Sequence, residues 1–267
     1  MSNNKSFWRA WLEGKTDKDE NHAQVSADPM EEGLENLAWK SPEGKPLIKK
    51  RKKRETFGEE IGNTITHGVM ALFMLFMLPY AAIRAYIHAP TGMKILDPVC
   101  VSVFVISVFF MFTASTIYHA MAPATEHKAV MNRIDHIMIY FAIAGTYTPI
   151  CLSVIGGKLG IGLCIAQWTL VVIGTLVKAL AFSKSLRSYI FTVAIYLLMG
   201  WMVVFCLPIL NESTTAPTFW LIFAGGLCYT SGVVSFSMKF PFAHMVWHFL
   251  VDFGAICHFL AIVYFMR

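Results

Sequence analysis

Seven strongly apolar segments, each near the length of a membrane-crossing helix, occupy most of the sequence after residue 63. An α-helix rises about 1.5 Å per residue, so roughly 20 apolar residues cross the ~30 Å hydrocarbon core of a bilayer. We therefore predict an all-α integral membrane protein, a seven-transmembrane helix bundle. The predicted spans are residues 64–87, 98–119, 133–155, 160–181, 187–208, 217–237 and 243–265.

The composition supports a membrane protein and excludes an ordinary soluble domain. Hydrophobic residues make up 56% of the 267 residues and charged residues only 15%, whereas soluble domains carry about 25% charged residues. The connections between spans are short, which forces neighbouring helices to run antiparallel in one compact bundle. The six cysteines lack Cys-x-x-Cys spacing, so we interpret them as packing residues and not as disulfides or metal ligands.

The charges are concentrated near the N-terminus. Residues 1–55 hold 12 of the 22 Lys and Arg and 10 of the 17 acidic residues. We expect a flexible cytoplasmic extension there, followed by a transmembrane domain at residues 56–267. The extension ends in a basic run, Lys49–Arg54, directly before the first span, so we expect it to bind anionic lipid headgroups and not nucleic acid. Cations also predominate in the loops on one side, which predicts a cytoplasmic N-terminus and an outside C-terminus.

Polar residues in three of the spans share a helical spacing. His244 and His248 in the last span lie four residues apart and therefore on one face of a helix. The second span ends in Ser115-x-x-x-His119, and the third span begins with Asp135. In the predicted topology all of these residues lie near the cytoplasmic side. We therefore expect them to form one site. For His244 and His248 alone, the alternative is two histidines that only form hydrogen bonds inside the bundle.

The chemistry of this set suits zinc. Three neutral imidazoles, here His119, His244 and His248, leave an open or water-filled position on the metal. Two roles are open for Asp135: as a direct ligand it closes a structural site, and one water away it prepares a hydrolytic nucleophile. Ser115 either hydrogen-bonds that water or a substrate oxyanion, or bonds back to its own helix.

Polar residues of the first span are expected to lie behind the metal ligands. Glu60, Asn63 and His67 fall within two turns on adjoining faces, and ionisable residues inside a membrane are usually functional. Alternatively, Glu60 caps the helix N-terminus and His67 bonds a neighbouring helix. Asp252, one turn beyond His248, either orients that ring or pairs with a polar group elsewhere. Other histidines lie on the wrong face, in a loop or too far along the last span to join the site, namely His136, His127 and His258.

Together these stretches resemble the hemolysin III branch of the progestin and adipoQ receptor family, over about residues 56–267. The resemblance implies a multi-pass protein of the bacterial plasma (inner) membrane with an intramembrane zinc held by His119, His244 and His248. It also implies that Asp135 is associated with the metal-bound water. Asp252 departs from the family pattern, in which an apolar residue is more usual. The motifs that carry the resemblance are Glu60-x-x-Asn63-x-x-x-His67, Ser115-x-x-x-His119, Asn132-x-x-Asp135, Gly145-Thr-Tyr-Thr-Pro149 and His244-x-x-x-His248 followed by His258-Phe259.

The resemblance also suggests a function, because the wider superfamily includes alkaline ceramidases. It implies a zinc-dependent hydrolase of lipid amides or esters that acts in membrane homeostasis, with membrane lipid as its substrate. One alternative is a receptor or membrane-state sensor with a structural zinc. A second is a cytolytic pore-forming protein, which we disfavour because the polar residues gather at one end of the spans and form no continuous track across. Nothing in the sequence indicates the oligomeric state.

Overall fold

A computed structural model describes residues 55–123, 125–180, 186–238 and 240–266 of the chain. Seven helical stretches in them are long and apolar enough to cross a membrane, which confirms the predicted all-α architecture. Residues 1–54 of the predicted extension, including its basic run Lys49–Arg54, lie outside the described residues. The described elements are α3 (Phe57–His88), η1 (Thr91–Met93), α4 (Leu96–Ala120), α5 (Glu126–Pro149), η2 (Ile150–Ile155), α6 (Gly157–Leu180), α7 (Leu186–Trp201), η3 (Met202–Cys206), α8 (Leu207–Ser213), α9 (Ala216–Ser237), α10 (Ala243–Phe259) and η4 (Leu260–Phe265).

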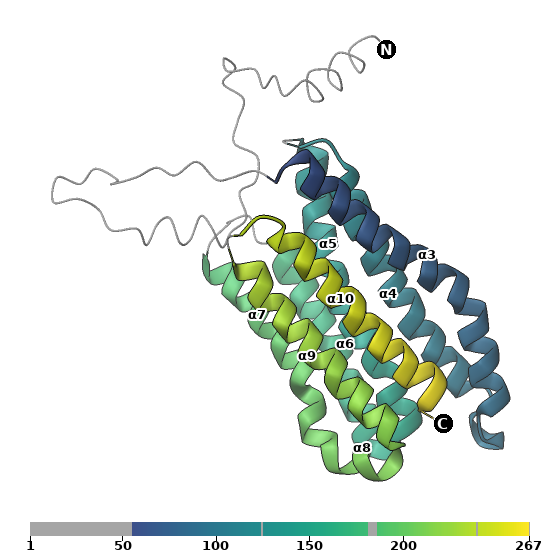
Figure 1. Cartoon of the computed structure of the whole chain (residues 1–267). Coiled ribbons are helices and arrows are strands. Elements are labelled where there is room, and N and C mark those ends of the chain that lie inside the picture. Colours follow the sequence, from purple (N-terminus) through teal and green to yellow (C-terminus); the bar gives the residue numbers. More distant parts are fainter. Residues whose placement is uncertain (1–54, 124, 181–185, 239, 267) are drawn as a thin grey trace, which may run out of the picture.

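The first and last spans of the bundle pack side by side. Helix α10 lies between α3 and α9 and contacts both (Figure 1). Helix α3 also packs along α4, α4 packs along α5, and α5 contacts α6 and α7. The starts of α3 and α10 lie at the same end of the bundle, the upper end in Figure 1. The end of α4 is there too, because His119 in its last turn bonds Glu60 in the first turn of α3.

Apolar side chains fill the interior and also cover the outside. Phe104 and Phe112 of α4 and Phe259 of α10 are fully buried in one cluster with side chains of α3. On the outside, Phe76 is 72% exposed and Phe205 82% exposed. A helix bundle whose interior and outer surface are both apolar is suited to a lipid environment and not to water.

Two helices begin in polar sequence, well before the apolar residues that predict them. Helix α3 begins at Phe57 and not at residue 64, because Thr56 and Glu59 form a reciprocal capping box that stabilises the first turn. Helix α5 begins at Glu126 and not at residue 133, with the Thr125 side chain as its N-cap. These polar turns carry Glu60 and Lys128, so the capping sequences place charged groups at one end of the bundle.

The fifth span is not the single continuous helix predicted for residues 187–208. It consists of α7, the 3₁₀ segment η3 and the short helix α8, in which Pro208 occupies the first turn. Proline has no N–H, and its ring clashes with the carbonyl four residues earlier, which weakens a regular helix at that point. Likewise, α5 ends at Pro149 and continues as the π-helical segment η2. Helix α3 nevertheless continues through Pro79.

Helices α5 and α6 pack closely at Gly174. A side chain added at this position would run into the ring of Tyr140, which is fully buried against α7. Gly162 in the same helix has open space around it. The two glycines therefore separate a packing requirement from the general effect of glycine in a helix.

We predict that Gly174→Ala destabilises the protein by about 1–3 kcal/mol, because the buried Tyr140 ring has to move. Gly162→Ala should be neutral or stabilising by up to ~1 kcal/mol, since alanine is the better helix former. Thermal unfolding of both variants in the same detergent measures the difference. Equal melting temperatures would contradict the predicted close contact.

Candidate metal centre

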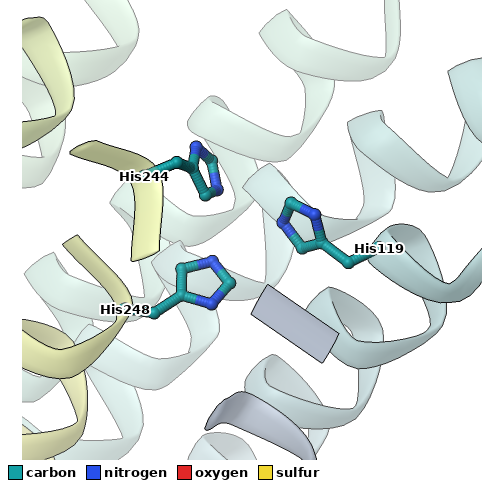
Figure 2. A group of neighbouring side chains, drawn as sticks. All are labelled: His119, His244 and His248. Atoms are coloured by element: carbon teal, nitrogen blue, oxygen red, sulfur yellow. The ribbon is translucent and has the colours of Figure 1, made fainter. Parts of the chain in front are cut away.

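Three histidines from two helices converge at the end of the bundle where α3 and α10 begin. His119 comes from the last turn of α4, and His244 and His248 come from the first two turns of α10. Each offers a ring nitrogen, and these atoms all lie within 4.8 Å of one another. The ring centroids are 4.9, 5.0 and 4.8 Å apart for the three pairs. Figure 2 shows the rings facing a common space, His119 from one side and the α10 pair from the other.

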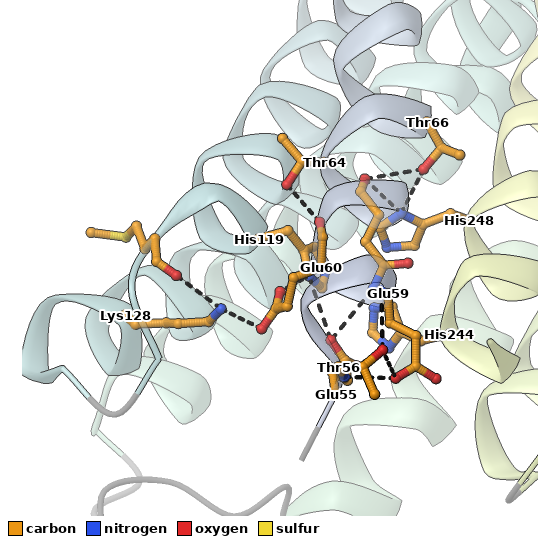
Figure 3. Close-up of polar contacts among 12 residues, drawn as sticks. Glu55, Thr56, Glu59, Glu60, Thr64, Thr66, His119, Lys128, His244 and His248 are labelled. Atoms are coloured by element: carbon orange, nitrogen blue, oxygen red, sulfur yellow. Dashed lines mark hydrogen bonds and ion pairs between the residues drawn. The ribbon is translucent and has the colours of Figure 1, made fainter. Parts of the chain in front are cut away.

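Hydrogen bonds to α3 orient two of these rings. His119 Nδ1 lies 2.8 Å from Glu60 Oε2 (Figure 3). His248 Nδ1 lies 3.2 Å from the backbone carbonyl of Asn63. A carboxylate can only accept a proton, so His119 Nδ1 must donate and His119 Nε2 is left with its lone pair. His248 Nδ1 also lies 3.1 Å from the Thr66 hydroxyl, and when it donates to the Asn63 carbonyl its Nε2 likewise keeps a lone pair. Among the described residues His119 Nε2 is buried without a hydrogen-bond partner. A carboxylate or carbonyl behind the ring is the usual arrangement of a metal-binding histidine.

His67 and Asp252 form a pair one turn deeper in the bundle. The His67 ring stacks on His248, with centroids 3.6 Å apart and planes 3° from parallel. His67 Nε2 lies 3.7 Å from Asp252 Oδ1, and both residues are buried. Of the two roles left open for Asp252, the structure therefore has the pairing with another group and not an orienting contact to His248. His67 lies behind the His248 ring and outside the group of converging nitrogens.

Asp135 and Ser115 lie beside the three histidines and not among them. The Ser115 hydroxyl is close enough to the Asp135 carboxyl group to interact with it, and Ser115 is one helical turn before His119. Asp135 Oδ2 is also 3.8 Å from His136 Nδ1. The described atoms close enough to share one metal ion with the histidines do not include Asp135. The geometry therefore favours an indirect role for this carboxylate over direct ligation.

Sequence interpretation missed Glu55, which it assigned to the extension. Glu55 Oε1 lies 3.4 Å from His244 Nδ1, and Glu55 Oε2 lies 3.8 Å from His119 Nδ1. With Glu60 and His119 it forms a second group of possible ligand atoms. The sequence did contain a signal for Glu55: it directly precedes the N-cap Thr56, and the first turn of α3 that follows contains the predicted site residue Glu60. Lys128, which bonds Glu60, was missed as well.

Comparison with known protein families agrees with this arrangement of helices and motifs. The model of the family "Haemolysin-III related" matches residues 55–259. The chain belongs to this family. It is 32% identical over 211 residues to the hemolysin-3 homolog of Bacillus subtilis (strain 168), a match that covers 79% of this chain and 95% of that protein. It is also 32% identical over 209 residues to hemolysin-3 of Bacillus cereus, covering 78% and 92%. No solved structure matched the chain. The haemolysin-III relatives and the seven spans together identify a multi-pass bacterial membrane protein.

The donor atoms of this haemolysin-III family member fit a zinc ion. Two nitrogens bound to one tetrahedral zinc lie about 3.4 Å apart, because each Zn–N bond is roughly 2.1 Å. The three ligand atoms lie within 4.8 Å of one another, so small rotations of the three side chains, of which His119 and His248 are buried and His244 is partly buried, bring them to that separation. Three imidazoles leave a fourth position open. His119 Nε2 is buried without a hydrogen-bond partner among the described residues, and a bound metal ion would provide one.

We predict that the purified protein binds one zinc ion per chain and that His119→Ala removes it. The matched control is His88→Ala, because His88 is at the other end of α3 and bonds only the Arg84 carbonyl among its recorded contacts. Elemental analysis after dialysis against a weak chelator measures the stoichiometry. Equal zinc in the two variants would place the metal elsewhere.

Proposed function

We propose that this protein is an intramembrane zinc-dependent hydrolase of lipid amides or esters. The observation that carries the proposal is the convergence of His119, His244 and His248, with Nδ1 of two rings held from behind, next to a serine–carboxylate pair. Structural zinc sites are usually closed by four protein ligands, whereas three ligands with an open position are typical of catalytic zinc. The three-histidine set and the indirect position of Asp135 correspond to the second kind.

Each group beside the ligands has a definite chemical role in this proposal. Zinc bound by the three histidines would polarise a carbonyl and lower the pKa of a coordinated water towards ~7. Asp135 accepts the proton of the attacking water and later returns it to the leaving amine or alcohol. In this proposal Ser115, whose hydroxyl is close to Asp135, orients that carboxylate. Glu60 and the Asn63 carbonyl keep the His119 and His248 rings in the tautomer that offers Nε2.

The position of the site at one end of the bundle supports a lipid substrate. In a bundle that spans a bilayer, the ends of the helices are expected near the boundary between headgroups and hydrocarbon, which is the depth of lipid ester and amide bonds. The outer faces of the flanking helices are apolar, with Ile65 58% exposed on α3 and Phe253 57% exposed on α10. Acyl chains can therefore lie against the same helices that hold the polar site.

We predict that His119→Ala and His244→Ala lose zinc and lipid turnover together. Asp135→Asn should retain zinc and lose turnover by roughly 10²-fold or more, because an amide cannot accept the proton that a general base takes. Zinc content and hydrolysis of fluorescent N-acyl and O-acyl lipids in vesicles are measured in parallel, with His88→Ala as the control. Full turnover in all three site variants would remove the enzyme from consideration.

A receptor or membrane-state sensor with a structural zinc is the second candidate, favoured by one observation. The histidines come from helices far apart in the sequence, so a metal ion would crosslink α4 to α10. In that case Asp135→Asn is mild, wild-type turnover stays at the level of empty vesicles, and zinc chelation mainly lowers the melting temperature. The same set of variants therefore separates the two candidates.

A further inference from the structure

Lys128, in the first turn of α5, is a buried cation beside the histidine cluster. Its Nζ donates to Glu60 Oε1 at 2.6 Å and to the Met121 carbonyl at 3.1 Å. It also lies 5.0 Å from the centroid of the Tyr118 ring. The N-cap Thr125 accepts a hydrogen bond from the Lys128 backbone, which fixes the turn that carries the side chain.

The two oxygens of Glu60 have different partners. Oε1 accepts from Lys128, and Oε2 accepts from His119 Nδ1 at 2.8 Å (Figure 3). A cation, a carboxylate and an imidazole from three different helices are therefore bonded in series. We propose that Lys128 is a positioning residue for the metal ligand His119 and acts through Glu60. This proposal rests on the metal site proposed above.

The physical reason is that a carboxylate with one partner can rotate and a carboxylate held at both oxygens cannot. Glu60 is partly buried, with 14% of its side chain exposed, so water can only partly replace a lost partner. Charge-assisted hydrogen bonds of this length are among the strongest in proteins. If Lys128 is removed, Glu60 is free to turn away, and the His119 ring loses the group that fixes its tautomer and orientation.

A purely structural role for Lys128 is the competing explanation, because its contacts to Met121 and Tyr118 tie α4 to α5. The chain contains a matched control for it. Lys94 at the other end of the bundle donates to the carbonyls of Tyr86 at 2.8 Å and Ile87 at 3.0 Å, and lies 5.2 Å from the Tyr86 ring. It thus makes carbonyl and ring contacts of the same kind. Within the described part of the chain it pairs with no carboxylate.

The test compares Lys128→Met, Lys128→Arg and Lys94→Met in the full-length protein reconstituted in nanodiscs. Zinc affinity is measured by competition with a chelator, and the geometry of the site by the visible absorption spectrum of the Co²⁺-loaded protein. Lys128→Met should weaken zinc binding about 10–100-fold and change the Co²⁺ spectrum. Lys128→Arg should restore most of the affinity, and Lys94→Met should leave both readouts unchanged.

A double variant tests whether the effect passes through Glu60. If Lys128 acts only on that carboxylate, Lys128→Met combined with Glu60→Gln should bind zinc no more weakly than Glu60→Gln alone. Additive losses, or a zinc affinity of Lys128→Met within about twofold of the wild type, would overturn the inference while the zinc site stands. A wild-type protein that binds no zinc would overturn the proposed function together with it. If Lys128→Met does not fold, Glu60→Gln alone decides the question, because a zinc affinity within about twofold of the wild type would show that His119 does not depend on this carboxylate.

Discussion

Buried imidazole nitrogens require polar partners, and this requirement connects the first described helix of the bundle to the last. In a helix bundle surrounded by lipid, no water is at hand to satisfy a polar atom turned inwards. Helix α3 supplies hydrogen-bond acceptors for two of these rings: the Asn63 carbonyl bonds His248, and Glu60 bonds His119. At the helix start, Glu59 Oε1 accepts from the backbone N–H of Phe242, whose left-handed conformation begins α10.

Besides apolar contacts, four polar pairs join α10 to α3 and to Glu55 just before it. From the bundle end inwards, the pairs are Glu59 with Phe242, Glu55 with His244, Asn63 with His248 and His67 with Asp252. The histidine cluster lies in the middle of this series, between a charged outer edge and a deeper buried pair. Changes on either side of the cluster can therefore alter its geometry without replacing a ligand.

Hydropathy and helical spacing predict the number of spans and the end of the bundle at which the polar residues gather. They do not predict how two helices meet, since that depends on crossing angles and side-chain shape. Asp252 therefore faces His67, although it is one turn from His248 in the sequence. Helix starts were missed for a related reason: capping by Thr56 and Thr125 extends α3 and α5 into polar sequence that no apolar pattern marks. Pro208 indicated a break near the end of the fifth span, but the prediction followed the apolar composition of the surrounding residues and treated the span as one helix.

The pairing of α3 with α10 also sets when the site can exist during biosynthesis. The partners Asn63 and His248 are separated by 185 residues, and a ribosome delivers the chain from its N-terminus onwards. Until the last helix has entered the bilayer, α3 and α4 hold Glu60 and His119 but neither histidine of α10. The three-histidine group can therefore form only after α10 has been made, and a product truncated before α10 lacks two of its three members.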